Sequence, residues 1–165
     1  MALLFATGLR ECLEEMRLSP IAVKFLGMLP SYFLQFSKKS IYPIVGWVSG
    51  QPRFTPNWEV AEVVYVPLEN LLNNNFYARY QIRFTASQED ILNTKLKGEK
   101  IRNHMENEFP CFLHEHDGEQ EILWGATYRM ITGLLEEISG FTPPDMETLP
   151  LVSKTLEENY FSGGG

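Results

Sequence analysis

Three carboxylates and a guanidinium group are gathered in the segment Arg10–Leu18, which reads R-E-C-L-E-E-M-R-L. Because an α-helix turns about 100° per residue, a helix here would bring Glu11, Glu14 and Glu15 to one face. Arg10 precedes Glu14 by four residues, the spacing at which an arginine can hold a carboxylate in place. Neighbouring carboxylates repel one another, and a cation that prefers oxygen ligands, such as Mg²⁺ or Mn²⁺, relieves that repulsion. Such an ion can bridge a diphosphate and activate a water molecule.

The same acidic pattern on an amphipathic helix is more often an ordinary solvated face. The wider motif around it is therefore needed to choose between a solvated face and a metal site. That motif resembles the second half of the Nudix box, G-x5-E-x7-R-E-U-x-E-E-x-G-U, in which U is a bulky aliphatic residue. Its defined slots are matched here by Arg10, Glu11, Glu14, Glu15 and Leu18. The resemblance implies that Glu11, Glu14 and Glu15 bind Mg²⁺ or Mn²⁺ and that Arg10, Glu14 and Glu15 serve catalysis.

Later segments resemble the coenzyme A diphosphatases within the same family. The similar stretches are Pro43–Val48, Glu59–Leu72, Phe109–Phe112 and Ile122–Met130, so that the resemblance covers roughly residues 3 to 140. It implies a small-molecule diphosphate substrate, coenzyme A or an acyl derivative. Hydrolysis of its diphosphate would give 3′,5′-ADP and a 4′-phosphopantetheine.

The chain also departs from the family pattern at the box. Ala2 stands at the slot of the first glutamate, and Arg17 replaces the glycine after the glutamates, which we expect to change the exit of the helix. The opening glycine of the box and the strands that precede it would lie before Met1. We therefore expect an N-terminally truncated domain, and we keep a catalytically impaired binding or interaction module as the alternative function.

Two further groups of residues invite a chemical interpretation. His114 and His116 alternate on a predicted strand and would share one face, which allows a metal pair, although a polar strand face is the commoner explanation. In Nudix enzymes a carboxylate from a later loop often serves as general base. The candidates for that role here are Glu115, Asp117, Glu119 and Glu121.

Hydrophobic periodicity predicts the elements that position these residues. We expect helices at about 3–17, 67–72 and 124–138, the last one stopped by Gly140. We expect strands at 21–28, 41–48, 60–66, 76–84, 109–116 and 121–123, with Asp117-Gly118 as the turn between the last two. The segment 87–108 is polar and mixed, with some helix expected.

This order of elements predicts an α/β fold, which the resemblance specifies as a Nudix-like α/β/α sandwich around a mixed sheet that lacks N-terminal strands. We expect one domain over residues 1–141 and a loosely packed C-terminal tail over 142–165. Without the preceding strands, the apolar strand Ile41–Val48 would be a bare edge. Such an edge lowers solubility or pairs two copies into a homodimer.

Composition limits the partners and the compartment. The net charge of −7 argues against binding to nucleic acid or to an anionic membrane surface, because both need clustered lysines and arginines. The two cysteines, Cys12 and Cys111, form neither a C-x-x-C motif nor a disulfide framework. We therefore expect reduced thiols and a cytoplasmic protein.

Overall fold

The computed structural model describes residues 2–34, 38–50, 52–83 and 108–155. The chain forms two compact units, Met1–Tyr65 and Val66–Gly165, and each is described here by itself. In these described ranges, no helix combines the length and the apolar character that crossing a membrane requires. The predicted excursion at 87–108 lies almost wholly outside the described residues.

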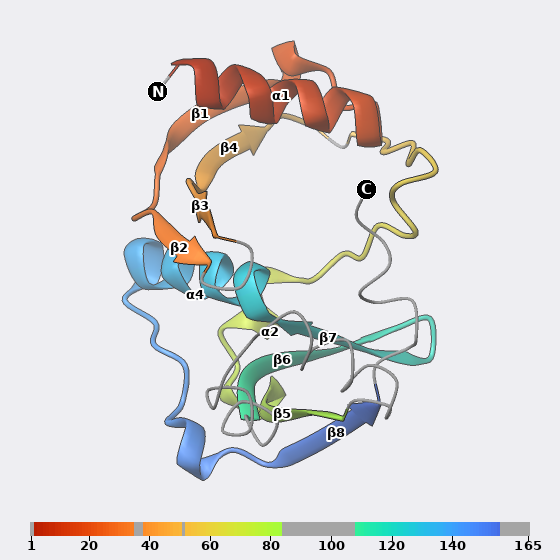
Figure 1. Cartoon of the computed structure of the whole chain (residues 1–165). Helices are drawn as coiled ribbons and strands as arrows, with labels where there is room; N and C mark the ends of the chain where they lie inside the picture. The colour runs from red at the N-terminus through yellow and green to blue at the C-terminus, as the bar shows by residue number, and fades with distance from the viewer. Residues whose placement is uncertain (1, 35–37, 51, 84–107, 156–165) are drawn as a thin grey trace. The chain divides into compact units, whose positions relative to one another are not determined.

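The first unit consists of one long helix and two antiparallel strand pairs (Figure 1). Its elements in chain order are α1 (Ala2–Met16), η1 (Pro20–Ala22), β1 (Val23–Met28), β2 (Tyr32–Leu34), β3 (Lys39–Ile41) and β4 (Ile44–Val48). β1 pairs with β4, and β2 pairs with β3. Phe5 of α1 meets Phe25 of β1 edge to face, with 5.1 Å between the ring centroids. This contact ties the first half of the helix to the strand pair.

The predicted helix at 3–17 is confirmed by α1, but its apolar stripe is only partly covered. Leu9, Cys12 and Met16 are half-buried, and Leu13 is 41% exposed. None of the 15 residues of α1, all of which the structure describes, is fully buried. Because burial of an apolar face supplies most of a helix's stability, α1 depends strongly on how its two ends are held.

The second unit contains a four-stranded mixed sheet and one long helix (Figure 1). Its elements are α2 (Leu68–Leu71), η2 (Asn74–Phe76), β5 (Tyr77–Arg83), β6 (Glu108–His116), β7 (Glu119–Trp124), α4 (Gly125–Ser139), η3 (Met146–Thr148) and β8 (Leu151–Thr155). The strand order is β7-β6-β5-β8, antiparallel except for the parallel pair β5–β8. The prediction of an α/β fold with a mixed sheet is confirmed.

The core of the second unit lies where α4 packs on one face of the sheet. Tyr77 of β5 and Phe112 of β6 stand opposite each other on that face, and Tyr128 and Leu135 of α4 pack against them. The hydroxyl of buried Tyr77 donates a hydrogen bond of 2.6 Å to the carbonyl of Leu71, so its polar atom is satisfied inside the core. α4 ends where Gly140 adopts φ 69°, as predicted.

Two strand predictions were wrong in part. Residues 60–66, all within the described range, form no strand despite their β-branched composition. β-Branched residues favour a strand only where the segment can join a sheet. No described strand pairs with residues 60–66 to bond their backbone N–H and C=O groups. The single strand predicted over 41–48 is two strands, interrupted at Tyr42-Pro43, because proline has no N–H for the ladder.

The segment after α4 is better packed than its composition indicated. Leu149 is 6% exposed and belongs to the core of the second unit, and β8 extends the sheet along β5. Arg79 of β5 donates through Nε to the carbonyl of Leu149 at 2.9 Å and forms an ion pair of 2.8 Å with Glu108. The expectation of a loosely packed segment is therefore wrong for residues 146–153. A short strand that follows a single buried leucine carries too little periodicity to be recognised from sequence.

A leucine pair tests this packing. We predict that Leu149→Ala lowers the free energy of unfolding of the second unit by about 2–5 kcal/mol, because it leaves a cavity in the core. Leu151→Ala removes the same atoms from a side chain that is 47% exposed and should cost less than about 1 kcal/mol. Urea unfolding followed by circular dichroism measures both. Equal losses in the two variants would show that Leu149 is not a core residue.

Candidate metal centre on the first helix

The guanidinium of Arg10 holds two of the three glutamates of α1. Its Nη1 donates to both carboxylate oxygens of Glu14, at 3.1 and 3.0 Å, and its Nη2 contacts a carboxylate oxygen of Glu11. Glu15 follows Glu14 on the same helix. The prediction that Arg10 orients a carboxylate four residues later is therefore confirmed in the geometry, and one cation of the protein organises the acidic face.

These side chains are open to solvent. The exposed fractions are 58% for Arg10, 45% for Glu11 and 53% for Glu14. Exposed ion pairs contribute only up to about 1 kcal/mol to stability. The arrangement is therefore a weak contribution to folding, and the carboxylate oxygens keep lone pairs that a ligand from solvent can reach.

The electrostatic character of this face is visible at its neighbour Cys12. Partial burial raises the pKa of the Cys12 thiol above its ordinary value, and the charges of Glu15 and then Glu11 raise it further. Both glutamates thus place a negative potential at the thiol. The same potential favours a cation at the acidic face.

α1 ends at a left-handed residue, Arg17, and the expected change of the helix exit stays a prediction. The N–H of Arg17 donates to the carbonyl of Leu13 at 3.1 Å, and the N–H of Leu18 donates to that of Cys12 at 3.2 Å. The bond from Arg17 to Leu13 is the one that defines the αL cap, in which the residue after the helix is left-handed and usually glycine. Arg17 adopts that conformation with φ 56°. Glycine, which the motif has at this slot, adopts such a conformation easily, whereas this chain adopts it with an arginine at a steric cost.

A distant segment of the same unit binds the last carbonyl groups of α1. The N–H of Thr55 donates to the carbonyl of Met16 at 3.0 Å, and the N–H of Asn57 donates to that of Glu15 at 2.8 Å. The side-chain amide of Asn57 donates to the carbonyl of Glu14 at 3.2 Å. Asn57 therefore fixes the backbone of two candidate metal ligands.

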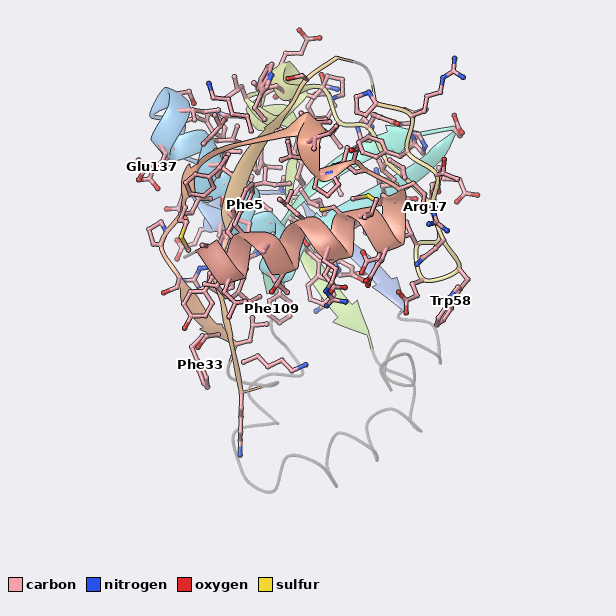
Figure 2. The ribbon with its side chains drawn as sticks, turned by 90° about the horizontal axis from the view of Figure 1, so that it is seen from above. Phe5, Arg17, Phe33, Trp58, Phe109 and Glu137 are labelled. Atoms are coloured by element: carbon pink, nitrogen blue, oxygen red, sulfur yellow. The ribbon has the colours of Figure 1, made fainter. Side chains whose placement is uncertain are left out.

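Sequence reasoning missed this role of Asn57. The available signal was slight: an asparagine after Pro56, a combination common in turns. Its side-chain oxygen also accepts from the N–H of Glu59 at 2.8 Å, which closes the local turn. Trp58, between Asn57 and Glu59 in the chain, is 89% exposed and is labelled together with Arg17 in Figure 2.

The donors on α1 fit a hard divalent cation. Carboxylate oxygens are the ligands of Mg²⁺ and Mn²⁺, and Glu11, Glu14 and Glu15 supply them from successive turns of one helix. The slot of the first glutamate carries Ala2, which offers no ligand. The ligands that α1 could offer to such a cation are thus three carboxylates.

The other residues singled out from sequence lie in the second unit. His114 and His116 are on β6, and the four carboxylates proposed as general base lie on or beside the β6–β7 hairpin. The structure does not bring them together with the glutamates of α1 in one unit. A general base among Glu115, Asp117, Glu119 and Glu121 stays a prediction.

Comparison of the sequence with known proteins finds relatives in one superfamily. No family model matches it. It is similar to the Nudix hydrolase NudL of Pectobacterium atrosepticum, which is named as uncharacterized, with 42% identity over 64 residues, 38% of this chain and 33% of that protein. It is also similar to the peroxisomal coenzyme A diphosphatase NUDT7 of Mus musculus, with 35% identity over 88 residues, 53% of this chain and 36% of that protein.

The chain is therefore related to the Nudix superfamily, as the half-box indicated, and its relatives are hydrolases. The matched segments span about a third of the length of these curated relatives. The resemblance stated from sequence is confirmed at the level of the superfamily.

The strained helix exit gives a test. We predict that Arg17→Gly raises the free energy of unfolding by about 1 kcal/mol, because glycine adopts the left-handed conformation without the steric cost of a Cβ atom. Gly140→Ala, at the matching position after α4, should lower it by a similar amount. Thermal unfolding measures both changes. A destabilised Arg17→Gly variant would mean that the arginine side chain contributes more than its backbone strain costs.

Proposed function

We propose that this chain hydrolyses the diphosphate bond of a nucleoside-diphosphate-linked substrate, and more specifically of coenzyme A or an acyl-coenzyme A. The observation that carries the proposal is the acidic face of α1, on which Arg10 holds Glu14 at 3.0 and 3.1 Å in the slots of the Nudix half-box. The relationship to Nudix hydrolases supports the reaction class. The name of the mouse relative supports the coenzyme A substrate.

Glu11, Glu14 and Glu15 would hold Mg²⁺ or Mn²⁺ on this face. When bound, such an ion neutralises diphosphate charge and activates water for attack on phosphorus. The protein's own residues do the positioning. Arg10 fixes the carboxylate of Glu14, and Asn57 fixes the backbone of Glu14 and Glu15, so that both side chains start from a defined point.

A bound divalent cation explains how an acidic protein could bind an anionic substrate. The glutamates and the diphosphate repel each other, and a divalent cation between them converts that repulsion into attraction. Hydrolysis breaks one P–O bond of the diphosphate, and water supplies the new oxygen. With coenzyme A the products are 3′,5′-ADP and 4′-phosphopantetheine. Each product keeps one phosphate of the cleaved diphosphate, and 3′,5′-ADP also carries the 3′-phosphate.

The alternative is a module that binds a nucleotide-like ligand or a partner without turning it over. Ala2 at the first glutamate slot favours it, since one carboxylate fewer weakens metal binding. The two candidates differ in a measurable property, namely the affinity of the acidic face for Mn²⁺. The absence of nucleic-acid and membrane partners, the homodimer and the cytoplasmic location stay predictions.

Charge-neutral variants of the glutamates test the proposal. We predict that Glu14→Gln and Glu15→Gln each lower the release of 3′,5′-ADP from coenzyme A by about 100-fold or more, because losing a ligand should cost at least as much as losing an outer-shell partner. Glu137→Gln on α4 removes the same charge from an exposed position and should leave the rate unchanged. Chromatographic product analysis with Mg²⁺ or Mn²⁺ measures all three.

Calorimetric titration with Mn²⁺ separates the two functions. Binding tighter than millimolar that disappears in the Glu14→Gln/Glu15→Gln variant supports the metal centre. Wild-type turnover that persists in both single variants would show that the metal assignment is wrong. A chain that neither binds Mn²⁺ nor turns over coenzyme A would favour the binding module.

A further inference from the structure

The end of the β6–β7 hairpin carries two histidines and two glutamates on one face. The strand register places His114 opposite Glu121 and His116 opposite Glu119. Residues directly opposite in an antiparallel pair point to the same face, with Cβ atoms about 4.5–5.5 Å apart. Two imidazoles from β6 thus stand against two carboxylates from β7.

The two imidazole rings are close and nearly parallel. Their centroids are 6.3 Å apart, with 24° between the ring planes. Two imidazoles on one Zn²⁺, each at a Zn–N distance of about 2.1 Å, have centroids roughly 5 Å apart. For both rings to bind one ion, their centroids would have to approach by roughly 1 Å, through rotation of the side chains about their own bonds.

The hairpin turn makes the register stable. Asp117 and Gly118 have φ 50° and 84°, so both central residues of the two-residue turn are left-handed. Asp-Gly in this conformation is the preferred turn of a tight hairpin and matches the twist of the strands. A slip by one residue would also expose the core residue Phe112, which lies on the same face as His114. The register therefore keeps the four residues on one face of the hairpin.

The ordinary explanation is that both faces of a hairpin become polar toward its tip. On the opposite face this is what happens: Leu113 pairs with Ile122 and packs on the sheet, and only the next pair, Glu115 and Gln120, is polar. The face with the histidines turns polar one pair earlier. On that face, two successive cross-strand pairs, His114–Glu121 and His116–Glu119, carry nitrogen and oxygen atoms that can bind a metal.

We propose that His114, His116, Glu119 and Glu121 form a binding site for a divalent transition metal, with Zn²⁺ and Ni²⁺ as the matching ions. Two imidazole nitrogens and carboxylate oxygens suit these borderline ions, whereas Mg²⁺ prefers oxygen ligands alone. This chemistry differs from that of the acidic face of α1. The ion would link β6 to β7 at the tip of the hairpin and stabilise it.

Calorimetric titration of the full chain with ZnCl₂ and with NiCl₂ tests the site. In the Glu14→Gln/Glu15→Gln variant, in which the acidic face of α1 no longer competes for the ion, we expect one ion to bind more tightly than about 100 μM. His114→Asn and His116→Asn, each added to that variant, should weaken binding by about tenfold or more. Glu121→Gln should weaken it as well. The matched control is Glu115→Gln on the other face of the same strand, which should keep the wild-type affinity.

Two further measurements exclude other binding sites. The hairpin site should keep its affinity for Zn²⁺ in the Glu14→Gln/Glu15→Gln and Cys12→Ser variants, so that failure of the hairpin site is distinguishable from failure of the proposed hydrolase. Zn²⁺ should also raise the melting temperature of the wild-type chain and of Glu115→Gln, but not of the histidine variants. Binding that is absent, or unchanged in both folded histidine variants, would overturn the proposal.

Discussion

The carbonyl groups at the end of α1 set the geometry of the first unit. All five from Cys12 to Met16 accept hydrogen bonds, two from Leu18 and Arg17 in the chain reversal and three from Thr55 and Asn57. A helix end leaves its last carbonyl groups without helical partners, and leaving them unsatisfied costs free energy. Because no residue of α1 is fully buried, these bonds position the helix as much as its apolar stripe does. The backbone of Glu14 and Glu15 on the acidic face is therefore held by hydrogen bonds from Asn57.

Burial is distributed differently in the second unit. There the sheet and α4 enclose aromatic and leucine side chains that are nearly inaccessible to solvent, and the polar residues gather at the tip of the β6–β7 hairpin. The two candidate metal sites, on α1 and on the β6–β7 hairpin, are thus held in place by different interactions. One relies on a capped helix end with solvent-exposed carboxylates, and the other relies on strand register fixed by a tight turn.

Sequence was informative where one signal was strong and local. Helical periodicity predicted α1 and α4, strand composition with alternation predicted β5, and the turn Asp117-Gly118 marked the hairpin of β6 and β7. It failed where the outcome depends on distant partners. The segment 60–66 has strand composition but no described partner, and β8 exists because β5 offers an edge. The position of Arg10 beside Glu14 followed from helix geometry, whereas the contact of Asn57 with Glu14 spans 43 residues and no spacing rule predicts it.

The parallel pairing of β5 with β8 has a consequence for synthesis on the ribosome. Tyr80 faces Val152, and the side chains of Gln81 and Ser153 meet at a sequence separation of 72 residues. At roughly 5–20 residues per second, β8 emerges about 4–14 s after β5. Hairpins form in about 1–10 μs, so the β6–β7 hairpin is complete long before that moment. During nascent-chain elongation the β5 edge awaiting β8 is bare, and that interval is when chaperones that shield strand edges would matter most.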